Sequence, residues 1–207
     1  MPEAWRGRLS DPEGTKEKRF RDVAQAVAGL VSNGGLAKVT VSAVARRAGV
    51  SRPWIYKYFG QEPDALVTHA ARLYAEAFSD LGRSRASSDV PTWRAHLTEA
   101  TRDGLRDAVL APWCVQLYFR HRHAPDAVGQ TIRDVEAAYV ERFLDEMPRS
   151  LRADEPATRR FVEVFTAARL GVFHRWLDPE FRARHDEDAV VDEILRPLDA
   201  WCAGRPT

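Results

Sequence analysis

Residues 40–59, TVSAVARRAGVSRPWIYKYF, predict two short helices joined by a tight turn. Thr40 is a suitable N-cap for the first helix, and apolar residues then recur at helical spacing. Gly49 can adopt the left-handed backbone that ends a helix. Ser51 can cap the second helix, and Pro53 fits its first turn, where a missing N–H removes no helical bond. The stretch therefore predicts a helix-turn-helix, a motif that inserts its second helix into a DNA major groove.

The same stretch resembles the TetR family of bacterial one-component transcriptional regulators. The family pattern is a Thr-capped helix with an Ala near its end, then Gly-Val-Ser, a three-residue spacer and Tyr-x-x-Phe. This chain supplies Thr40, Ala45, Ala48-Gly49-Val50-Ser51, Tyr56 and Phe59. An upstream apolar stripe matches the family's first helix at Phe20, Val23, Ala24, Val27, Leu30 and Val31. The resemblance covers about residues 16 to 81.

This resemblance implies which residues contact DNA. It makes Ser42, Arg52 and Trp54 candidates for base contact, and the Arg52 fork suits guanine N7 and O6. Tyr56, Lys57 and Tyr58 are candidates for phosphate or base contact. Trp54 has two interpretations, because the family usually has a small residue there: its indole packs on a thymine methyl group or on a neighbouring helix. Lys57 and the tyrosine hydroxyls suit phosphate oxygens. The residues expected to contact DNA are Thr40, Ser42, Ser51, Arg52, Trp54, Tyr56, Lys57 and Tyr58.

One position departs from the family pattern. After Tyr-x-x-Phe the family commonly has a Lys that opens the next helix and holds a phosphate, whereas this chain has Glu62. Because a carboxylate repels a phosphate, we expect DNA affinity to depend more on the N-terminal arm. In that arm Arg6-Gly7-Arg8 either reaches a minor groove or belongs to an unordered tail.

Charge is distributed unevenly along the 207 residues. Residues 1–59 carry eleven Lys and Arg against five Asp and Glu, a net charge of +6. The other 148 residues carry 20 Lys and Arg against 25 Asp and Glu, a net charge of −5. A basic head on an acidic body directs the head toward phosphates, although a chance imbalance on solvated faces gives the same count.

The periodicity predicts an all-α chain of three parts. They are a disordered N-terminal arm at 1–14, a three-helix DNA-binding domain at 15–62, and a larger effector-binding and dimerisation domain at 63–207. Helix 1 is expected from about Thr15 to Asn33, and a connecting helix spans 63–81. After a loop at 82–91, further helices are expected at 92–109, 112–122, 125–147, 156–178 and 187–203.

The last two helical patterns are apolar over wide faces. Pairing them with their copies would give an isologous four-helix bundle, which is where the resembled family dimerises. Alternatively, both stripes face only their own core. The residues expected at a dimer interface are Phe165, Val172, Trp176, Val191, Ile194, Leu195 and Leu198.

The body also holds many aromatic residues. Since the resembled family encloses an effector pocket in its body, some of them are candidates to line it, and aromatic walls suit a largely apolar ligand. The alternative is that they are ordinary core aromatics. The ligand candidates are Trp93, Trp113, Tyr118, Tyr139, Phe143 and Phe173.

No pattern in the sequence indicates catalysis, a cofactor or a metal. His121 and His123 are two apart and point to different sides of a helix, and Cys114 and Cys202 fit no metal spacing. No Gly-x-Ser-x-Gly, His-Glu-x-x-His or phosphate loop occurs. The N-terminus lacks the apolar core of a signal peptide, and no apolar run approaches the roughly 18 residues of a membrane span, so we expect a cytoplasmic protein.

These observations predict a homodimeric, ligand-responsive regulator, most often a repressor in such families. Its two heads are expected to enter successive major grooves of a palindromic operator, about one turn (~34–36 Å) apart. A small, largely apolar effector is expected to release it. The alternative is a helix-turn-helix regulator whose C-terminal domain binds a partner protein instead.

Overall fold

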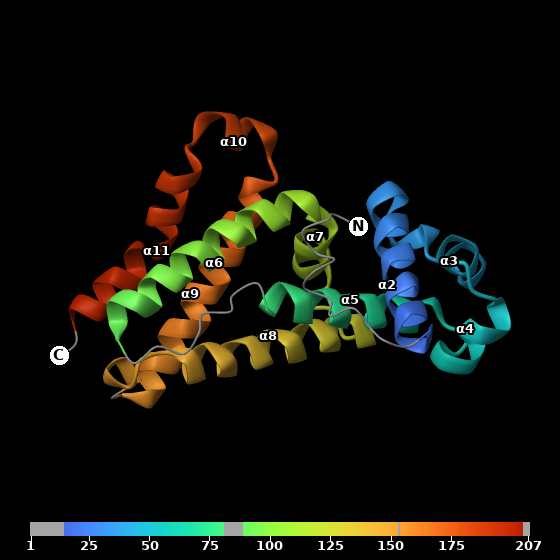
Figure 1. The fold of residues 1–207 in the computed structure, drawn as a ribbon, viewed down its shortest axis with the longest axis horizontal. Helices are drawn as coiled ribbons and strands as arrows, with labels where there is room; N and C mark the ends of the chain where they lie inside the picture. The colour runs from blue at the N-terminus through green and yellow to red at the C-terminus, as the bar shows by residue number, and fades with distance from the viewer. Residues whose placement is uncertain (1–14, 81–88, 153, 205–207) are drawn as a thin grey trace. The chain divides into compact units, whose positions relative to one another are not determined.

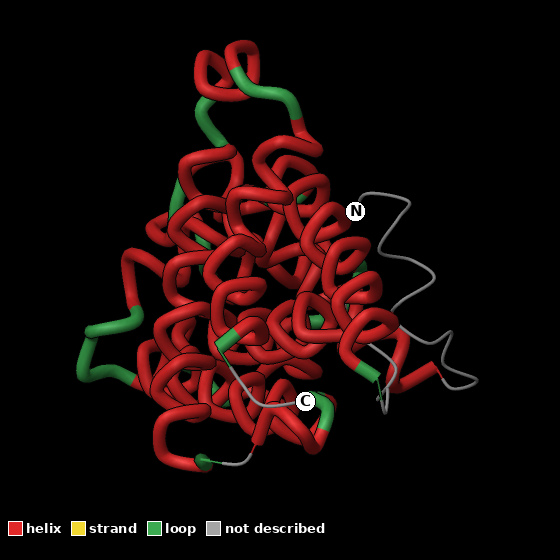
Figure 2. The backbone as a smooth tube through the Cα atoms, turned by 90° about the vertical axis from the view of Figure 1, so that its left-hand side faces the viewer, coloured by secondary structure: helices red, strands yellow, loops and turns green. Residues whose placement is uncertain are grey.

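The computed structural model describes residues 15–80, 89–152 and 154–204. Within these ranges the chain forms helices joined by short loops and no strand (Figure 2), which confirms the all-α fold class. The elements are α2 Thr15–Gly34, η1 Leu36–Lys38, α3 Val41–Ala48, α4 Arg52–Phe59, α5 Pro63–Asp80, α6 Val90–Leu110, α7 Pro112–His121, α8 Ala127–Glu146, η2 Arg149–Arg152, α9 Glu155–Trp176, α10 Pro179–Arg184 and α11 Glu187–Ala203. No helix in these ranges combines the length and the apolar character that crossing a membrane requires.

The predicted helices are present, with ends displaced by a few residues at most. The short helix α10 was not predicted, although its start signals are visible in the sequence. Asp178 caps it by accepting a hydrogen bond from the Glu180 N–H at 2.9 Å, and Pro179 follows in its first turn. The N-terminal arm and residues 82–88 of the predicted loop lie outside the described residues.

Contacts divide the chain into two compact units. The first contains the described residues up to Ala77 together with Gln116–Val135, and the second contains Phe78–Val115 and the residues from Glu136 onward. In the first unit α3 and α4 lie beside α2 (Figure 1). Its buried apolar side chains include Val23, Ala24 and Val27 of α2, Val44 and Ala45 of α3, Ile55 of α4, and Leu66, Val67 and Ala70 of α5.

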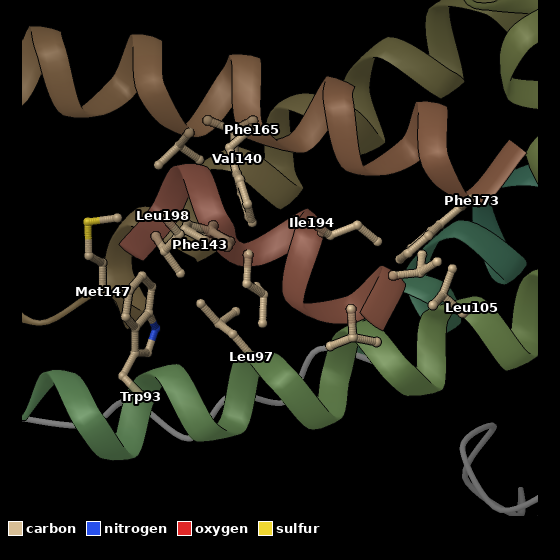
Figure 3. Packing of buried hydrophobic residues seen from close by; sticks show 14 of the residues in the cluster. Trp93, Leu97, Leu105, Val140, Phe143, Met147, Phe165, Phe173, Ile194 and Leu198 are labelled. Atoms are coloured by element: carbon tan, nitrogen blue, oxygen red, sulfur yellow. The ribbon is translucent and has the colours of Figure 1, made fainter. Parts of the chain in front are cut away.

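The second unit is built around α6, α9 and α11. Figure 3 shows their side chains pointing toward one another, with Phe143 and Met147 completing the cluster. The contributing residues are Trp93, Leu97 and Leu105 of α6, Phe165 and Phe173 of α9, and Ile194 and Leu198 of α11.

An exposed ion pair links two of these helices. The Arg94 guanidinium donates from Nε and Nη2 to the Asp199 carboxylate at 3.1 and 3.0 Å, and this hydrogen bonding raises the pKa of Arg94. Exposed pairs of this kind contribute only about 0–1 kcal/mol. The apolar cluster therefore accounts for most of the packing between α6 and α11.

Candidate nucleic-acid interface

Two capped helices meet at a glycine turn, as the sequence predicts. The Thr40 hydroxyl accepts a hydrogen bond from the Ala43 N–H at 3.1 Å, and the Ser51 hydroxyl accepts one from the Trp54 N–H at 3.3 Å. Gly49 adopts φ 67° and ψ 27°, the left-handed conformation. A Cβ there would meet nothing within 4 Å, so glycine is favoured at this position by its backbone angles alone. The predicted caps are confirmed.

The exposed face of α4 carries the functional groups. Ile55 is fully buried and anchors the helix, whereas Arg52, Tyr56 and Lys57 are exposed. The Arg52 Nη2 donates to the Tyr56 hydroxyl at 3.3 Å, which places the guanidinium beside the phenol. Thr40, Ser42 and Ser51 are exposed as well, at or near the first turns of α3 and α4. A guanidinium, a phenol and an ammonium group thus face outward from one short helix.

Trp54 and Tyr58 lie differently from these residues. Both are half-buried, and both pack against Phe20 of α2, with ring centroids 5.4 and 5.5 Å from its ring. Their own rings lie 4.7 Å apart. Of the two interpretations of Trp54, packing on a neighbouring helix is therefore the arrangement observed.

These residues belong to an aromatic cluster formed by Phe20, Trp54, Tyr58, Phe59 and His69. The Phe20 ring lies at its centre, 5.2 Å from Phe59 and 5.4 Å from His69. The His69 Nε2 also bonds the Phe20 backbone oxygen at 3.0 Å, so this nitrogen carries the proton. The cluster joins α2, α4 and α5. Neither Phe20 nor His69 was predicted as a site residue, and the only sequence signal was the place of Phe20 in the apolar stripe of α2.

Two lysines lie near one ring of this cluster. The Lys57 Nζ lies 5.3 Å from the Tyr58 ring centroid, and the Lys16 Nζ, from the first turn of α2, lies 5.2 Å from it. Both lysines are exposed. The start of α2 and the outer face of α4 therefore form one continuous cationic edge, which is the arrangement that binds a phosphate backbone.

Other charged residues of this unit are placed elsewhere. The Arg47 guanidinium lies over Gly29 of α2, where a Cβ would come within 2.5 Å of its Nη2. Arg47 is therefore directed at α2, and both Arg46 and Arg47 are exposed. Glu62 is exposed immediately before α5, and its backbone oxygen accepts a hydrogen bond from the Ala65 N–H at 3.2 Å.

The predicted ligand residues divide between the two units. Four come together in the second unit, where the Trp93 and Phe143 ring centroids are 5.6 Å apart and those of Tyr139 and Phe143 are 6.2 Å apart. Phe173 belongs to the same cluster. Trp113 is buried outside this cluster, and Tyr118 is half-buried in the first unit.

The predicted dimer residues pack within their own unit. Val172 is partly buried against the apolar cluster, and six others are at most 6% exposed: Phe165, Trp176, Val191, Ile194, Leu195 and Leu198. The alternative that the stripes face their own core accounts for these side chains. A dimer built on α9 and α11 would therefore meet through the outward faces of these helices.

Comparison with known proteins relates these features to a family. Residues 24–61 match the family model of bacterial regulatory proteins, tetR family. No curated protein matches the chain.

Solved structures share the fold at low sequence identity. A tetR-family transcriptional regulator from Streptomyces coelicolor has a TM-score of 0.68 and 17% identity, covering 92% of this chain and 82% of that one. The fatty acid degradation regulator FadR from Bacillus halodurans has a TM-score of 0.66 and 17% identity, and the match covers 86% of this chain and 97% of that one. NalD is the secondary repressor of the MexAB-OprM multidrug efflux pump in Pseudomonas aeruginosa. It has a TM-score of 0.59 and 18% identity, and the match covers 91% of this chain and 97% of that one. The matched residues 24–61 contain the whole helix-turn-helix, so this part of the chain is a DNA-binding domain of the TetR family of transcriptional regulators.

Proposed function

We propose that this regulator is a homodimeric repressor that binds a palindromic operator and is released by a small, largely apolar effector. The observation that carries the proposal is the outer face of α4, where Arg52, Tyr56 and Lys57 are exposed on a capped helix anchored by Ile55. Two such helices, one from each protomer, would enter major grooves about one helical turn (~34–36 Å) apart.

Each side chain on this surface has a distinct role in the proposal. Arg52 reads a guanine through two parallel hydrogen bonds, because its planar fork matches N7 and O6. Lys57 and Lys16, which both lie near the Tyr58 ring, bind phosphates. The remaining hydroxyl residues, Thr40, Ser42 and Ser51, lie at or near helix starts, where backbone N–H groups also favour phosphate.

Replacing Lys57 tests the phosphate role. Lys57→Ala is expected to weaken binding to all duplexes alike. The slope of log K against log salt concentration should become shallower by about one per protomer, since one counterion fewer is released. Lys57→Arg, which keeps the charge, should retain the wild-type slope. Fluorescence anisotropy at several salt concentrations measures both. An unchanged slope in Lys57→Ala would show that this ammonium group does not contact phosphate.

The dimer proposal uses the outward face of α9. Val164 is 70% exposed at the middle of that helix, and the neighbouring Ala167 and Ala168 are exposed too. An exposed valine among small residues allows a second helix to approach closely, as in an isologous bundle. The same face would then be buried in both protomers.

Val164→Arg tests this face. The substitution is expected to leave the fold intact, because the side chain is exposed, and to shift the protein from dimer to monomer, because a two-fold interface would bring two like charges together. Leu110→Arg, at a 47% exposed position of α6, is the matched control and should remain dimeric. Sedimentation equilibrium measures the mass. A dimeric Val164→Arg protein would refute this interface.

The apolar effector is proposed from the second unit, where four of the predicted aromatic residues share one cluster. Regulation by repression is supported by NalD, a similar structure described as a repressor. FadR, another similar structure, is described as a regulator of fatty acid degradation, a process with apolar substrates.

The function as a whole is tested with genomic DNA. Fragments retained by the protein should share a palindrome, and a reporter placed behind that palindrome should fall in expression when the protein is present. Apolar compounds should release the DNA in a mobility-shift assay. Retention of no fragment above a random-sequence control would refute operator binding, and a reporter that rises would identify an activator. If no compound releases the DNA but a second protein that binds the C-terminal domain does, the result would support the partner-protein alternative.

A further inference from the structure

Arg169 is a charged residue inside the second unit. It is 7% exposed, and its neighbours one turn away on either side of α9, Phe165 and Phe173, are 3% and 1% exposed. The helix therefore turns Arg169 toward the core. A guanidinium keeps its proton in proteins, so the charge is buried with the side chain, and a buried charge is costly unless it has partners.

The partners of Arg169 within the chain are incomplete. Its Nη2 donates to the Tyr139 hydroxyl, and the guanidinium lies 5.3 Å from the Tyr139 ring centroid and 5.5 Å from that of Phe173. Nε and Nη1 have no acceptor among the described residues. Since Nε carries one hydrogen and Nη1 two, three buried N–H groups have no hydrogen-bond acceptor within the described part of the chain.

Two buried threonine hydroxyls in the same unit also lack a hydrogen-bond partner among the described residues. Thr101 of α6 and Thr166 of α9 are 0% and 4% exposed, and neither hydroxyl has a hydrogen-bond partner among the described residues. Two other buried threonines, one in α9 and one in α8, bond the carbonyl four residues earlier. Thr158 does so to Asp154 at 2.6 Å and Thr131 to Ala127 at 2.9 Å. Thr101 and Thr166 do not use this ordinary arrangement.

Helix register places these groups at one level. Thr166 lies one turn before Arg169 on α9. Figure 3 shows Leu97 and Leu105 along α6 in the same order as Phe165 and Phe173 along α9. In sequence, Thr101 lies midway between Leu97 and Leu105, and Arg169 lies midway between Phe165 and Phe173. Gly104 brings the helices close, because a Cβ there would lie 2.7 Å from the Phe173 Cζ.

We propose that Arg169 anchors the carboxylate of a small ligand with an apolar body, and that the Thr101 and Thr166 hydroxyls add hydrogen bonds to it. A carboxylate is planar and accepts two parallel N–H bonds from a guanidinium, which satisfies the open donors and pairs the buried charge. The surrounding cluster, with Phe143 and Phe173, suits an apolar body. The inference rests on the proposed ligand response and defines the chemical class of the effector.

Binding of matched probes to the full chain tests the anchor. Phenylacetate and octanoate should bind and raise the melting temperature, whereas phenylacetamide and octanamide, which lack the charge, should have little effect. Arg169→Gln should weaken carboxylate binding by roughly tenfold to hundredfold in calorimetry, since a charge-assisted hydrogen bond is lost. Arg160→Gln, at an exposed position of the same helix, is the matched control and should bind like the wild type.

Further variants separate the anchor from a structural role. Arg169→Met should melt no lower than the wild type without ligand, because a buried charge without an ionic partner is removed. A structural arginine would instead lower the melting temperature equally with and without carboxylate. The Thr101→Val and Thr166→Val double variant keeps the shape of both side chains and should bind carboxylate roughly tenfold more weakly. Wild-type protein indifferent to both carboxylates, or Arg169→Gln binding them as tightly as the wild type, would overturn the proposal.

DNA release in the same samples distinguishes this proposal from the proposed function. Phenylacetate should release the wild type and Arg160→Gln from DNA, but not Arg169→Gln. A chain that binds carboxylate through Arg169 and never binds duplex DNA would refute the regulator and leave the anchor intact. Release by phenylacetamide as readily as by phenylacetate, with Arg169→Gln equally sensitive, would support the ligand response and refute the anchor.

Discussion

Arg52→Ala is expected to abolish most of the preference for operator over random DNA. A bidentate arginine–guanine pair contributes about 1–3 kcal/mol of discrimination, and the proposed dimer would lose it at both half-sites. Arg52 is exposed on α4, so the substitution leaves the buried side of the helix unchanged. Operator affinity should therefore fall by roughly a hundredfold or more, because each 1.4 kcal/mol is a factor of ten. Competitive mobility shifts with operator and random duplexes measure the ratio.

Arg52→Lys is the matched control for charge. A lysine restores the positive charge but not the planar fork, so its binding should keep the wild-type salt dependence while its preference for operator stays low. Operators with the guanine replaced at each position identify the base that is read. Equal loss of affinity for operator and random DNA in Arg52→Ala would show that Arg52 contacts only the backbone.

Phe20→Ala is expected to detach α4 from the rest of the first unit. The Phe20 ring touches four other rings of the aromatic cluster, from α4 and α5. Removing a phenylalanine from a core costs about 3–5 kcal/mol, and Phe20 is only half-buried, so about 2–4 kcal/mol is expected here. Specific DNA binding should fall with the loss of α4 order. Hydrogen exchange of the α4 amides measures the opening, and the α6 and α9 amides serve as internal controls.

Phe20→Leu separates apolar volume from ring contacts. Leucine keeps most of the volume and loses the aromatic pairs, each of which contributes about 0.5–1.5 kcal/mol. Its α4 amides should exchange at a rate between those of the wild type and Phe20→Ala. If Phe20→Ala leaves α4 exchange and DNA affinity at wild-type values, the cluster does not position the recognition helix.

Local signals made the helix-turn-helix predictable. The caps at Thr40 and Ser51 and the left-handed Gly49 depend on residues within four positions of each other, so the sequence is sufficient to place them. The aromatic cluster depends instead on contacts between distant residues, since Phe20 and His69 are 49 apart. The orientation of Trp54 follows from those contacts and could not be read from α4 alone.

The second unit shows the same limit. An apolar stripe states that a face is buried but not against which partner, so Ile194 and Leu195 fit a dimer interface or their own core equally well until the packing is known. Arg169 could have been noticed, because its spacing from Phe165 and Phe173 places it on the same buried side of α9. Which of its N–H groups find an acceptor, however, depends on residues distant in sequence, such as Tyr139, 30 residues away.

The first turn of α2 has an electrostatic consequence for the unbound protein. Lys16, Lys18 and Arg19 are all exposed at the helix start, where the peptide dipoles already concentrate positive charge, and Glu17 is the acid of that turn. Lys18 pairs with Asp22 at 2.9 Å, whereas Lys16 and Arg19 are repelled by the positive helix end when no other anion is near. Phosphates along the cationic edge would relieve that repulsion, so duplex association and completion of the first turn are thermodynamically linked. The first turn of α2 would then be most stable when the regulator occupies its operator.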